Sequence, residues 1–176
     1  SSVRELTIAS NTIQATYSPG GANVRMIGSG PDGARKAGMA TITGNIIGSQ
    51  ETSVYLKNCQ HLALSGNFLY SSQYRNLWME GCADVVFTAN SIGHNADYGD
   101  KELATGIRIE RSRRCNLNGF SIQDAQAAAN TVAGAIPLDR RALIEILSSE
   151  AISICNAQLT AGAPHAVLVE NSSLVS

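Results

Sequence analysis

Two stretches of the sequence decide the fold, Leu62-Ala-Leu-Ser-Gly-Asn67-Phe-Leu69 and Val85-Val-Phe-Thr-Ala-Asn90-Ser-Ile92. In both, apolar residues occupy the first, third and eighth positions and Asn occupies the sixth. The same template fits four more segments: Leu6/Ile8/Asn11/Ile13, Ala40/Ile42/Asn45/Ile47, Cys115/Leu117/Phe120/Ile122 and Ile152/Ile154/Ala157/Leu159. In the last two of these, Phe120 and Ala157 replace Asn. Six copies of one unit indicate a repeat protein.

A second short apolar pair precedes every copy after the first, at Val24/Met26, Val54/Leu56, Leu77/Met79, Ile107/Ile109 and Ile144/Ile146, and a last pair is Val167/Val169. In four coils the first apolar residue of the next template follows the end of this pair by six residues, and Val175 begins a seventh copy at the same offset. Short alternating runs predict strands rather than helices. Their regular spacing predicts a parallel β-helix, each coil about 4.8 Å above the last.

Two stacks of side chains are expected inside this solenoid. Asn11, Asn45, Asn67 and Asn90 would form an Asn ladder, because Asn tolerates the left-handed backbone of a tight corner and can hydrogen-bond from coil to coil. The thiols of Cys59 and Cys82 occupy equivalent positions on consecutive coils and would stack as small buried groups, followed by Ser112, Ser149 and Ser172.

The order of strand, corner, strand, Asn and strand resembles the pectin-lyase-like superfamily of right-handed parallel β-helices, over nearly all of residues 1–176. The resemblance implies one all-β domain of about six coils. It places Val54/Leu56 on a first sheet, Leu62/Leu64 on a second and Leu69 on a third, with variable loops between the third and first sheets. The two longest loops, 93–106 and 123–142, would lie side by side, and Asp124 would cap a short helix in the latter.

Composition limits the function classes. The chain has 176 residues, 44% of them apolar and 15% charged, and a formal net charge of −1. Without a basic run, we expect no nucleic-acid partner. No apolar stretch reaches the roughly 20 residues of a membrane span and no signal segment is present, so we expect no membrane partner and a signal removed if the protein is exported.

Candidate site residues come from the outward positions of the first sheet. These positions form two columns, Arg25, Tyr55, Trp78, Arg108, Glu145, Leu168 and Ile27, Lys57, Glu80, Glu110, Leu147, Glu170. Aromatic rings beside charged groups suit a sugar chain. We therefore predict that a polysaccharide or oligosaccharide binds at Tyr55, Trp78, Arg25, Lys57 and Glu145. Trp78 is either the anchor of this site or a packed residue covered by a long loop.

Catalysis is a separate hypothesis. Glu80 and Glu110 are expected on adjacent coils, near the separation of about 5 Å used by retaining glycosidases, where one carboxyl would have a raised pKa. Arg108 on the same strip and His94 at the start of a long loop would assist. The alternative is a ladder of solvated ion pairs among Lys57, Glu80 and Arg108.

Family motifs test this hypothesis. Gly106-Ile-Arg-Ile-Glu110 resembles the Arg-Ile-Lys segment of polygalacturonases, but the Gly-His-Gly segment and the aspartates of that signature are absent. A pectate-lyase site would need more carboxylates for calcium than the strip offers. An enzyme on this scaffold would be a polysaccharide lyase or a glycoside hydrolase of another type.

We expect neither a metal site nor a cofactor. Cys59, Cys82, Cys115 and Cys155 lack metal-ligand spacing, and the loop with His94, Asp97, Asp100 and Glu102 lacks that of a calcium loop. His61 and His165 fit ordinary surface positions.

Two functions from different classes remain open, a carbohydrate-associated domain and a structural or adhesive β-helix such as a phage tail-spike or surface-protein segment. Both imply an extracellular, cell-surface or virion-surface location. The open coil at each end would be covered by self-association or by a longer β-helix of which this chain is a fragment.

Overall fold

The computed structural model describes residues 4–30, 37–95, 106–123, 140–160, 162 and 164–176. Eighteen strands and no helix occur in these residues. No helix long and apolar enough to cross a membrane is found in this part of the chain. The helix expected after Asp124 and the packing of the two longest loops fall outside the described residues.

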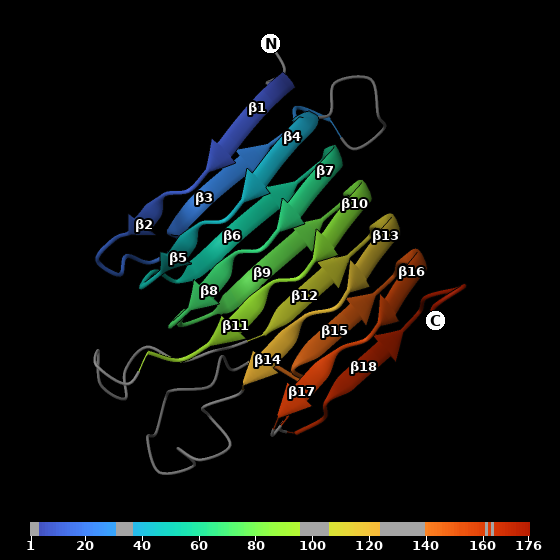
Figure 1. The fold of residues 1–176 in the computed structure, drawn as a ribbon. Helices are drawn as coiled ribbons and strands as arrows, with labels where there is room; N and C mark the ends of the chain where they lie inside the picture. The colour runs from blue at the N-terminus through green and yellow to red at the C-terminus, as the bar shows by residue number, and fades with distance from the viewer. Residues whose placement is uncertain (1–3, 31–36, 96–105, 124–139, 161, 163) are drawn as a thin grey trace.

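The strands form three parallel sheets of six (Figure 1). The first sheet contains β3 (Ala22–Ile27), β6 (Thr52–Lys57), β9 (Arg75–Glu80), β12 (Ile107–Glu110), β15 (Ile144–Leu147) and β18 (Val167–Glu170). The second contains β1 (Arg4–Ala9), β4 (Ala37–Thr43), β7 (Cys59–Ser65), β10 (Ala83–Thr88), β13 (Arg113–Asn118) and β16 (Glu150–Cys155). The third contains β2 (Thr12–Gln14), β5 (Ile46–Gly48), β8 (Phe68–Tyr70), β11 (Ser91–Gly93), β14 (Ser121–Gln123) and β17 (Gln158–Thr160).

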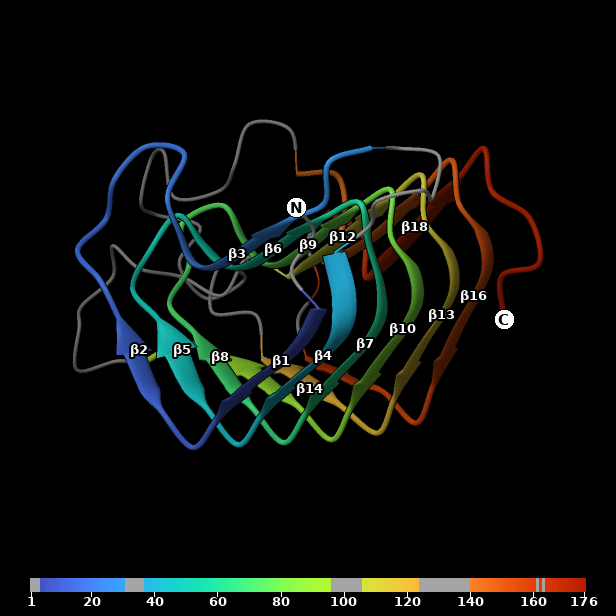
Figure 2. The same ribbon diagram turned by 90° about the horizontal axis from the view of Figure 1, so that it is seen from above.

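Each sheet therefore takes one strand from each coil, and the coils stack along one axis as a β-helix (Figure 2). The register confirms the predicted columns, with Tyr55 opposite Trp78 and Glu80 opposite Glu110. Ser173 pairs with Glu150, which puts Val175 in register as the start of a seventh second-sheet segment. The two termini lie at opposite ends of the stack (Figure 1).

Inward side chains of the three sheets fill the core. Leu56 and Leu77 of the first sheet are fully buried, and Leu64 and Leu69 of the other two are 1% exposed. Burial of such a side chain stabilises the folded state by about 1.5–3 kcal/mol. The outward neighbours alternate with these residues, so any site on the first sheet must use the columns that begin at Arg25 and Ile27.

The Asn ladder is confirmed in its hydrogen bonds. The side-chain amide of Asn45 donates to Oδ1 of Asn67 at 3.0 Å, and that of Asn67 donates to Oδ1 of Asn90 at 2.9 Å. The backbone N–H groups of Asn45 and Asn67 donate to the same two oxygens. The ladder continues to Asn11, whose amide donates to Asn45.

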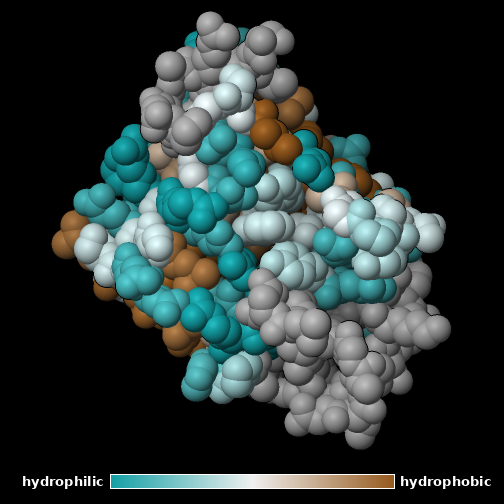
Figure 3. Space-filling view, turned by 180° about the vertical axis from the view of Figure 1, so that it is seen from behind, coloured by the Kyte–Doolittle hydropathy of each residue, from teal (hydrophilic) through white to brown (hydrophobic). Residues whose placement is uncertain are grey.

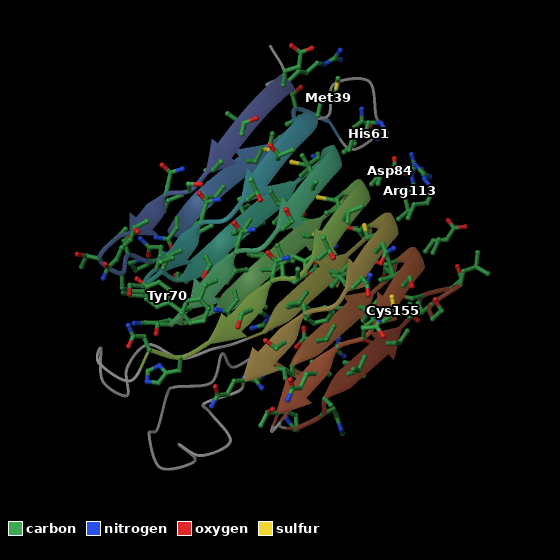
Figure 4. All side chains as sticks on the ribbon, in the orientation of Figure 1. Met39, His61, Tyr70, Asp84, Arg113 and Cys155 are labelled. Carbon is green, nitrogen blue, oxygen red and sulfur yellow. The ribbon has the colours of Figure 1, made fainter. Side chains whose placement is uncertain are left out.

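The expected left-handed conformation of these Asn residues is wrong, because the preceding residue takes it. Ser10, Gly44, Gly66 and Ala89 have φ angles of 57°, 63°, 62° and 52°. The corner thus turns one residue earlier, and the Asn side chain is left free to point along the stack. Each strand of the second sheet has another residue with a left-handed backbone near its start, such as His61 and Asp84. These two residues lie at the same end of neighbouring strands (Figure 4).

The sulfur atoms behave as expected. Cys59, Cys82 and Cys115 are buried, whereas Cys155 is partly exposed, and all four are free thiols. Sγ of Cys82 contacts the carbonyl oxygen of Leu56 on the coil before it, at 3.4 Å. On the next coil the backbone N–H of Cys82 donates to Oγ of Ser112 at 3.1 Å, so the predicted stack passes from thiol to hydroxyl.

Candidate functional site

An aromatic cleft of about 200 Å³ opens on the outer face of the first sheet. Its lining residues are Gly20, Gly21, Ala22, Arg25, Glu51, Thr52, Tyr55 and Trp78. The rings of Tyr55 and Trp78 lie 4.7 Å apart between centroids, with an angle of 44° between their planes. The guanidinium of Arg25 lies 5.3 Å from the Tyr55 ring centroid. Three of the predicted binding residues, Arg25, Tyr55 and Trp78, thus meet in one cleft.

The turn at Gly20 and Gly21 forms another part of the wall of the aromatic cleft. Oε2 of Glu51 accepts the backbone N–H of Gly20 at 2.7 Å, and Arg25 donates to the carbonyl oxygen of Gly20 at 3.1 Å. A Cβ atom on Gly21 would lie 2.5 Å from the Gln50 side chain, so this close approach requires glycine. The wall is therefore held in place by side chains from the next coil.

Trp78 is one of the lining residues of the cleft. It is partly buried, and the Tyr74 ring meets it edge-on with centroids 5.3 Å apart. Its indole Nε1 is buried without a hydrogen-bond partner among the described residues. Tyr74, from the segment before β9, thus packs against Trp78, and the indole also lines the cleft. Most of the two long loops that the alternative places over Trp78 falls outside the described residues, so its role as an anchor stays a prediction.

A carboxylate cluster of Glu80 and Glu110 lies at the far end of the same strands. The carboxylate of Glu80 pairs with Nζ of Lys57 at 2.9 Å and with a guanidinium nitrogen of Arg111 at 2.7 Å, and it accepts a hydrogen bond from the hydroxyl of Tyr55 at 2.9 Å. Glu110 pairs with Arg108 and with Arg111, the latter at 3.2 Å. The adjacent register of the two carboxylates is as predicted. Of the alternative ion-pair ladder, the Lys57–Glu80 pair is present, but Arg108 pairs with Glu110 and Glu145, and Arg111 was not part of it.

These partners determine the ionisation of the cluster. Burial opposes the charged form of Glu80, but hydrogen bonds from Lys57, Tyr55 and Arg111 outweigh it and lower its pKa. The expectation of a raised carboxyl pKa is therefore not met at Glu80, because cations neutralise the pair. Burial, and next the hydrogen bond to Glu80, raises the pKa of Tyr55 to about 12. A carboxylate whose pKa is lowered is ionised at neutral pH, so it can bind through its charge but is poorly suited to donate a proton as a general acid.

The prediction that Glu145 is an exposed binding residue is wrong. Glu145 stands in the expected column but is fully buried rather than exposed. Its carboxylate accepts the backbone N–H groups of Arg141 and Ala142 at 2.7 and 3.3 Å, and it pairs with Arg75 at 3.3 Å and with Arg108 at 3.4 Å. The chain at residues 140–143 provides this cover, so Glu145 supports the sheet and does not face a ligand.

His94 also lies away from the carboxylate cluster. It follows β11 at the end of the third sheet, where Nδ1 lies 3.4 Å from Oγ of Ser71. Glu80 and Glu110 end their strands. The loop with His94 leads to the start of β12, whereas Glu110 lies at the end of β12, and a strand rises about 3.3 Å per residue.

Two contributors to the aromatic cleft were missed in the sequence, Glu51 and Tyr74. Both precede a first-sheet strand and lie outside the repeated template, so no periodicity marks them. Arg111 was missed for the same reason at the other end of the strands. Its position after Glu110 was the available signal, because a cation there can reach two stacked carboxylates.

Seen from behind the view of Figure 1, hydrophilic residues dominate the described part of the face, with smaller hydrophobic patches among them and near its outline (Figure 3). No group of three or more His, Cys, Asp or Glu side chains that could hold a metal ion occurs among the described residues. The chemistry available at the cleft is aromatic stacking with hydrogen bonding from Arg25 and Glu51.

Comparison with known proteins places the chain by fold. A search of curated proteins found no match. The surface protein and adhesin PfbA of Streptococcus pneumoniae is similar in structure, with a TM-score of 0.52 and 11% identity. The match covers 99% of this chain and 61% of that protein, so the chain spans less than two thirds of its length. At this identity the similarity shows the fold.

A family model described as the right-handed β-helix region matches residues 33–176. The match covers most of the chain, and it agrees with the three parallel sheets and with the handedness that the resemblance implied. The chain therefore belongs to the right-handed β-helix family.

Proposed function

We propose that this chain is a carbohydrate-binding β-helix domain of a cell-surface or virion-surface protein, with the sugar held in the aromatic cleft. The observation that carries the proposal is the Tyr55–Trp78 pair, which lines the cleft together with the Gly20 turn. Sugar rings present C–H faces that pack on aromatic rings and hydroxyls that bond to charged groups at the edge. Arg25 and Glu51 supply those groups.

Binding is a better-supported role than cleavage. Each carboxylate of the carboxylate cluster is paired with at least two cations, and the pKa of Glu80 is lowered. Glycoside hydrolysis by two carboxylates requires one of them to hold a proton. The carboxylate cluster instead offers charged groups to a sugar chain that extends out of the cleft. Tyr55 connects the two, because its ring lines the cleft and its hydroxyl donates to Glu80.

A glycan array followed by fluorescence titration tests the proposal. Trp78 is the only Trp in the sequence, so its emission reports on the cleft directly. We expect acrylamide to quench it and a bound oligogalacturonate or chitohexaose to protect it. Trp78→Ala, assayed by calorimetry because this variant has no Trp to report on, should weaken binding at least about tenfold, as loss of an aromatic anchor does. Val86→Ala, at an exposed outward position on the second sheet, should not change it.

The second candidate is an adhesive β-helix without affinity for sugar, which the similarity to a surface adhesin favours. It would leave Trp78 emission unchanged with every array sugar. A reducing-sugar release assay on the same polysaccharides separates binding from cleavage, and we expect no release. Sustained release that Glu80→Gln abolishes would overturn the assignment of the cluster to binding.

A further inference from the structure

A second hollow lies on the third sheet, away from the aromatic cleft. It measures about 260 Å³ and is lined by Phe68, Ser91, Ile92, Gly93, His94, Ser121, Ile122, Gln123, Gln158 and Thr160. We call it the third-sheet hollow. It belongs to strands β8, β11, β14 and β17, which are consecutive in that sheet.

The hollow follows from a step in side-chain size along one outward column. The column reads Thr12, Ile46, Phe68, Ser91, Ser121 and Gln158 from coil to coil. Bulk falls sharply after Phe68 and returns at Gln158. Because coils are about 4.8 Å apart, the shelf between Phe68 and Gln158 spans roughly 14 Å.

The aromatic wall of the hollow is held in a fixed position. The Phe68 ring stacks on Tyr70 with centroids 5.7 Å apart and 17° between the planes. Tyr70, at the end of β8 (Figure 4), is 3% exposed, and it packs so closely on Gly48 that a Cβ there would lie 2.6 Å from its ring. On the other side, a Cβ on Gly93 would lie 3.4 Å from the Phe68 ring. A rigid wall reduces the entropy lost on binding.

Apart from the imidazole of His94, the polar side chains of the hollow are uncharged hydroxyls and amides. Ser121 donates to Ser91 between hydroxyl oxygens at 3.2 Å, and Thr160, Gln123 and Gln158 border the shelf. No Asp, Glu, Lys or Arg is among its described lining residues. Hydroxyl and amide groups both donate and accept hydrogen bonds, whereas a charged ligand would lose hydration here without finding a carboxylate, ammonium or guanidinium partner among the described lining residues.

We propose that the third-sheet hollow is a second binding site, for a neutral saccharide unit whose ring packs against Phe68 and whose hydroxyls bond to Ser91, Ser121 and the glutamine amides. The chain then presents two sites on different faces of one solenoid, a charged cleft on the first sheet and a neutral one on the third. This proposal does not depend on the occupant of the aromatic cleft.

The test is a titration of the ¹⁵N-labelled chain with maltose, cellobiose, lactose and diacetylchitobiose, each to about 10 mM, so that a site with a Kd of about 1 mM approaches saturation. We expect at least one of them to shift the amide signals of Ser91, Gly93 and Ser121. Ser121→Ile fills the shelf with a residue that strands favour, and it should raise the Kd at least tenfold.

The matched control is Thr12→Ile, on the same outward column but outside the hollow, which should leave the Kd unchanged. Absence of shifts at Ser91 and Ser121 with all four sugars would overturn the proposal, as would unchanged binding by Ser121→Ile. Shifts confined to Tyr55 and Trp78 would also overturn it while supporting the proposed function. Sugar-induced shifts of the amide signals of β11 and β14, with Trp78 quenched by acrylamide as strongly as in the free protein, would support the third-sheet site and contradict the proposed function.

Discussion

At the scale of single residues, each Asn corner uses two neighbouring residues for two different tasks. Gly66 takes the left-handed backbone conformation, and Asn67 supplies the side chain that joins three coils. Oδ1 of Asn67 accepts from the backbone and side chain of Asn45, while its amide donates to Ile42 and Asn90. The two positions therefore tolerate different substitutions.

Asn67→Ala should lower the free energy of unfolding by about 2–4 kcal/mol, because it leaves buried donors and acceptors of Asn45 and Ile42 without partners, at about 1–3 kcal/mol for each such group. The measurement is equilibrium denaturation in urea. Asn11→Ala at the exposed end of the ladder is the control and should cost less than about 1 kcal/mol, since Asn11 contributes only donors there. Equal losses in the two variants would contradict the ladder as a source of stability.

Glu80 makes the stability of the protein depend on pH in the acid range. Its pKa is lowered in the folded state, so the stability it contributes is fully present above its unfolded pKa of about 4.3 and is lost as the pH falls through the lower folded value. Glu80→Gln should remove this dependence, so that the variant and the wild type converge at low pH.

Acid unfolding followed by circular dichroism at several pH values measures this effect. Lys57→Met removes one of the three donors of Glu80 and should have a smaller effect in the same direction. A difference between Glu80→Gln and wild type that grows as the pH falls would refute the assigned sign.

At the scale of elements, a buried ion pair joins two strands that are not neighbours. Arg75 of β9 and Glu145 of β15 are both fully buried and lie 3.3 Å apart, with β12 between their strands. Gly106 precedes β12 with a φ of 90°, and a Cβ there would lie 2.0 Å from the carbonyl oxygen of Leu143. The pair ties three coils together at the start of the first-sheet strands.

Glu145→Ala should lower the free energy of unfolding by about 3–5 kcal/mol, because it leaves a buried guanidinium without its carboxylate. Replacing both partners, as Arg75→Met with Glu145→Leu, should recover part of the loss, because the buried guanidinium is removed together with its carboxylate, although the backbone N–H groups of Arg141 and Ala142 still lose their acceptor. Thermal and urea denaturation of the two variants provide the comparison. A Glu145→Ala protein as stable as wild type would show that the carboxylate is not buried.

Sequence reasoning predicted the sheets because their signal is periodic. Alternation and a constant offset determine which residues face inward and which stack, so the pairing of Tyr55 with Trp78 followed directly. Glu51 and Tyr74 could not be found, because they lie in connections whose path depends on neighbouring coils. The burial of Glu145 was missed because its cover, residues 140–143, is irregular.

At the scale of the whole molecule, burial decreases from the middle coils towards both ends. Leu56 and Leu77 in the middle are fully buried, whereas Leu6 and Leu159 in the terminal coils are only partly buried. In a solenoid each coil contacts only its neighbours, so stability is a sum of local terms and the terminal coils have fewer of them. The self-association or longer solenoid expected from the open coils stays a prediction.

Hydrogen exchange should follow this gradient. Amides of β6, β9 and β12 should exchange only through global unfolding, while those of β2 and β17 should exchange through local opening that is lower in free energy. Mass-spectrometric exchange at neutral pH resolves the difference by segment. Uniform protection from β1 to β18 would show that the molecule opens as one cooperative unit, contrary to this expectation.

The ladder has a consequence for how such a chain changes over evolutionary time. Successive Asn residues of the ladder from Asn11 to Asn90 are separated by 34, 22 and 23 residues, although at each step the backbone N–H and the side-chain amide donate to Oδ1 of the next Asn. Most of the extra length of the first interval lies in the connection between β3 and β4, and the rest lies between β2 and β3, where the Gly20 turn borders the aromatic cleft. Insertions and deletions there leave the pairing of every coil intact, so new ligand specificities can arise by loop exchange while selection on folding acts on the rungs.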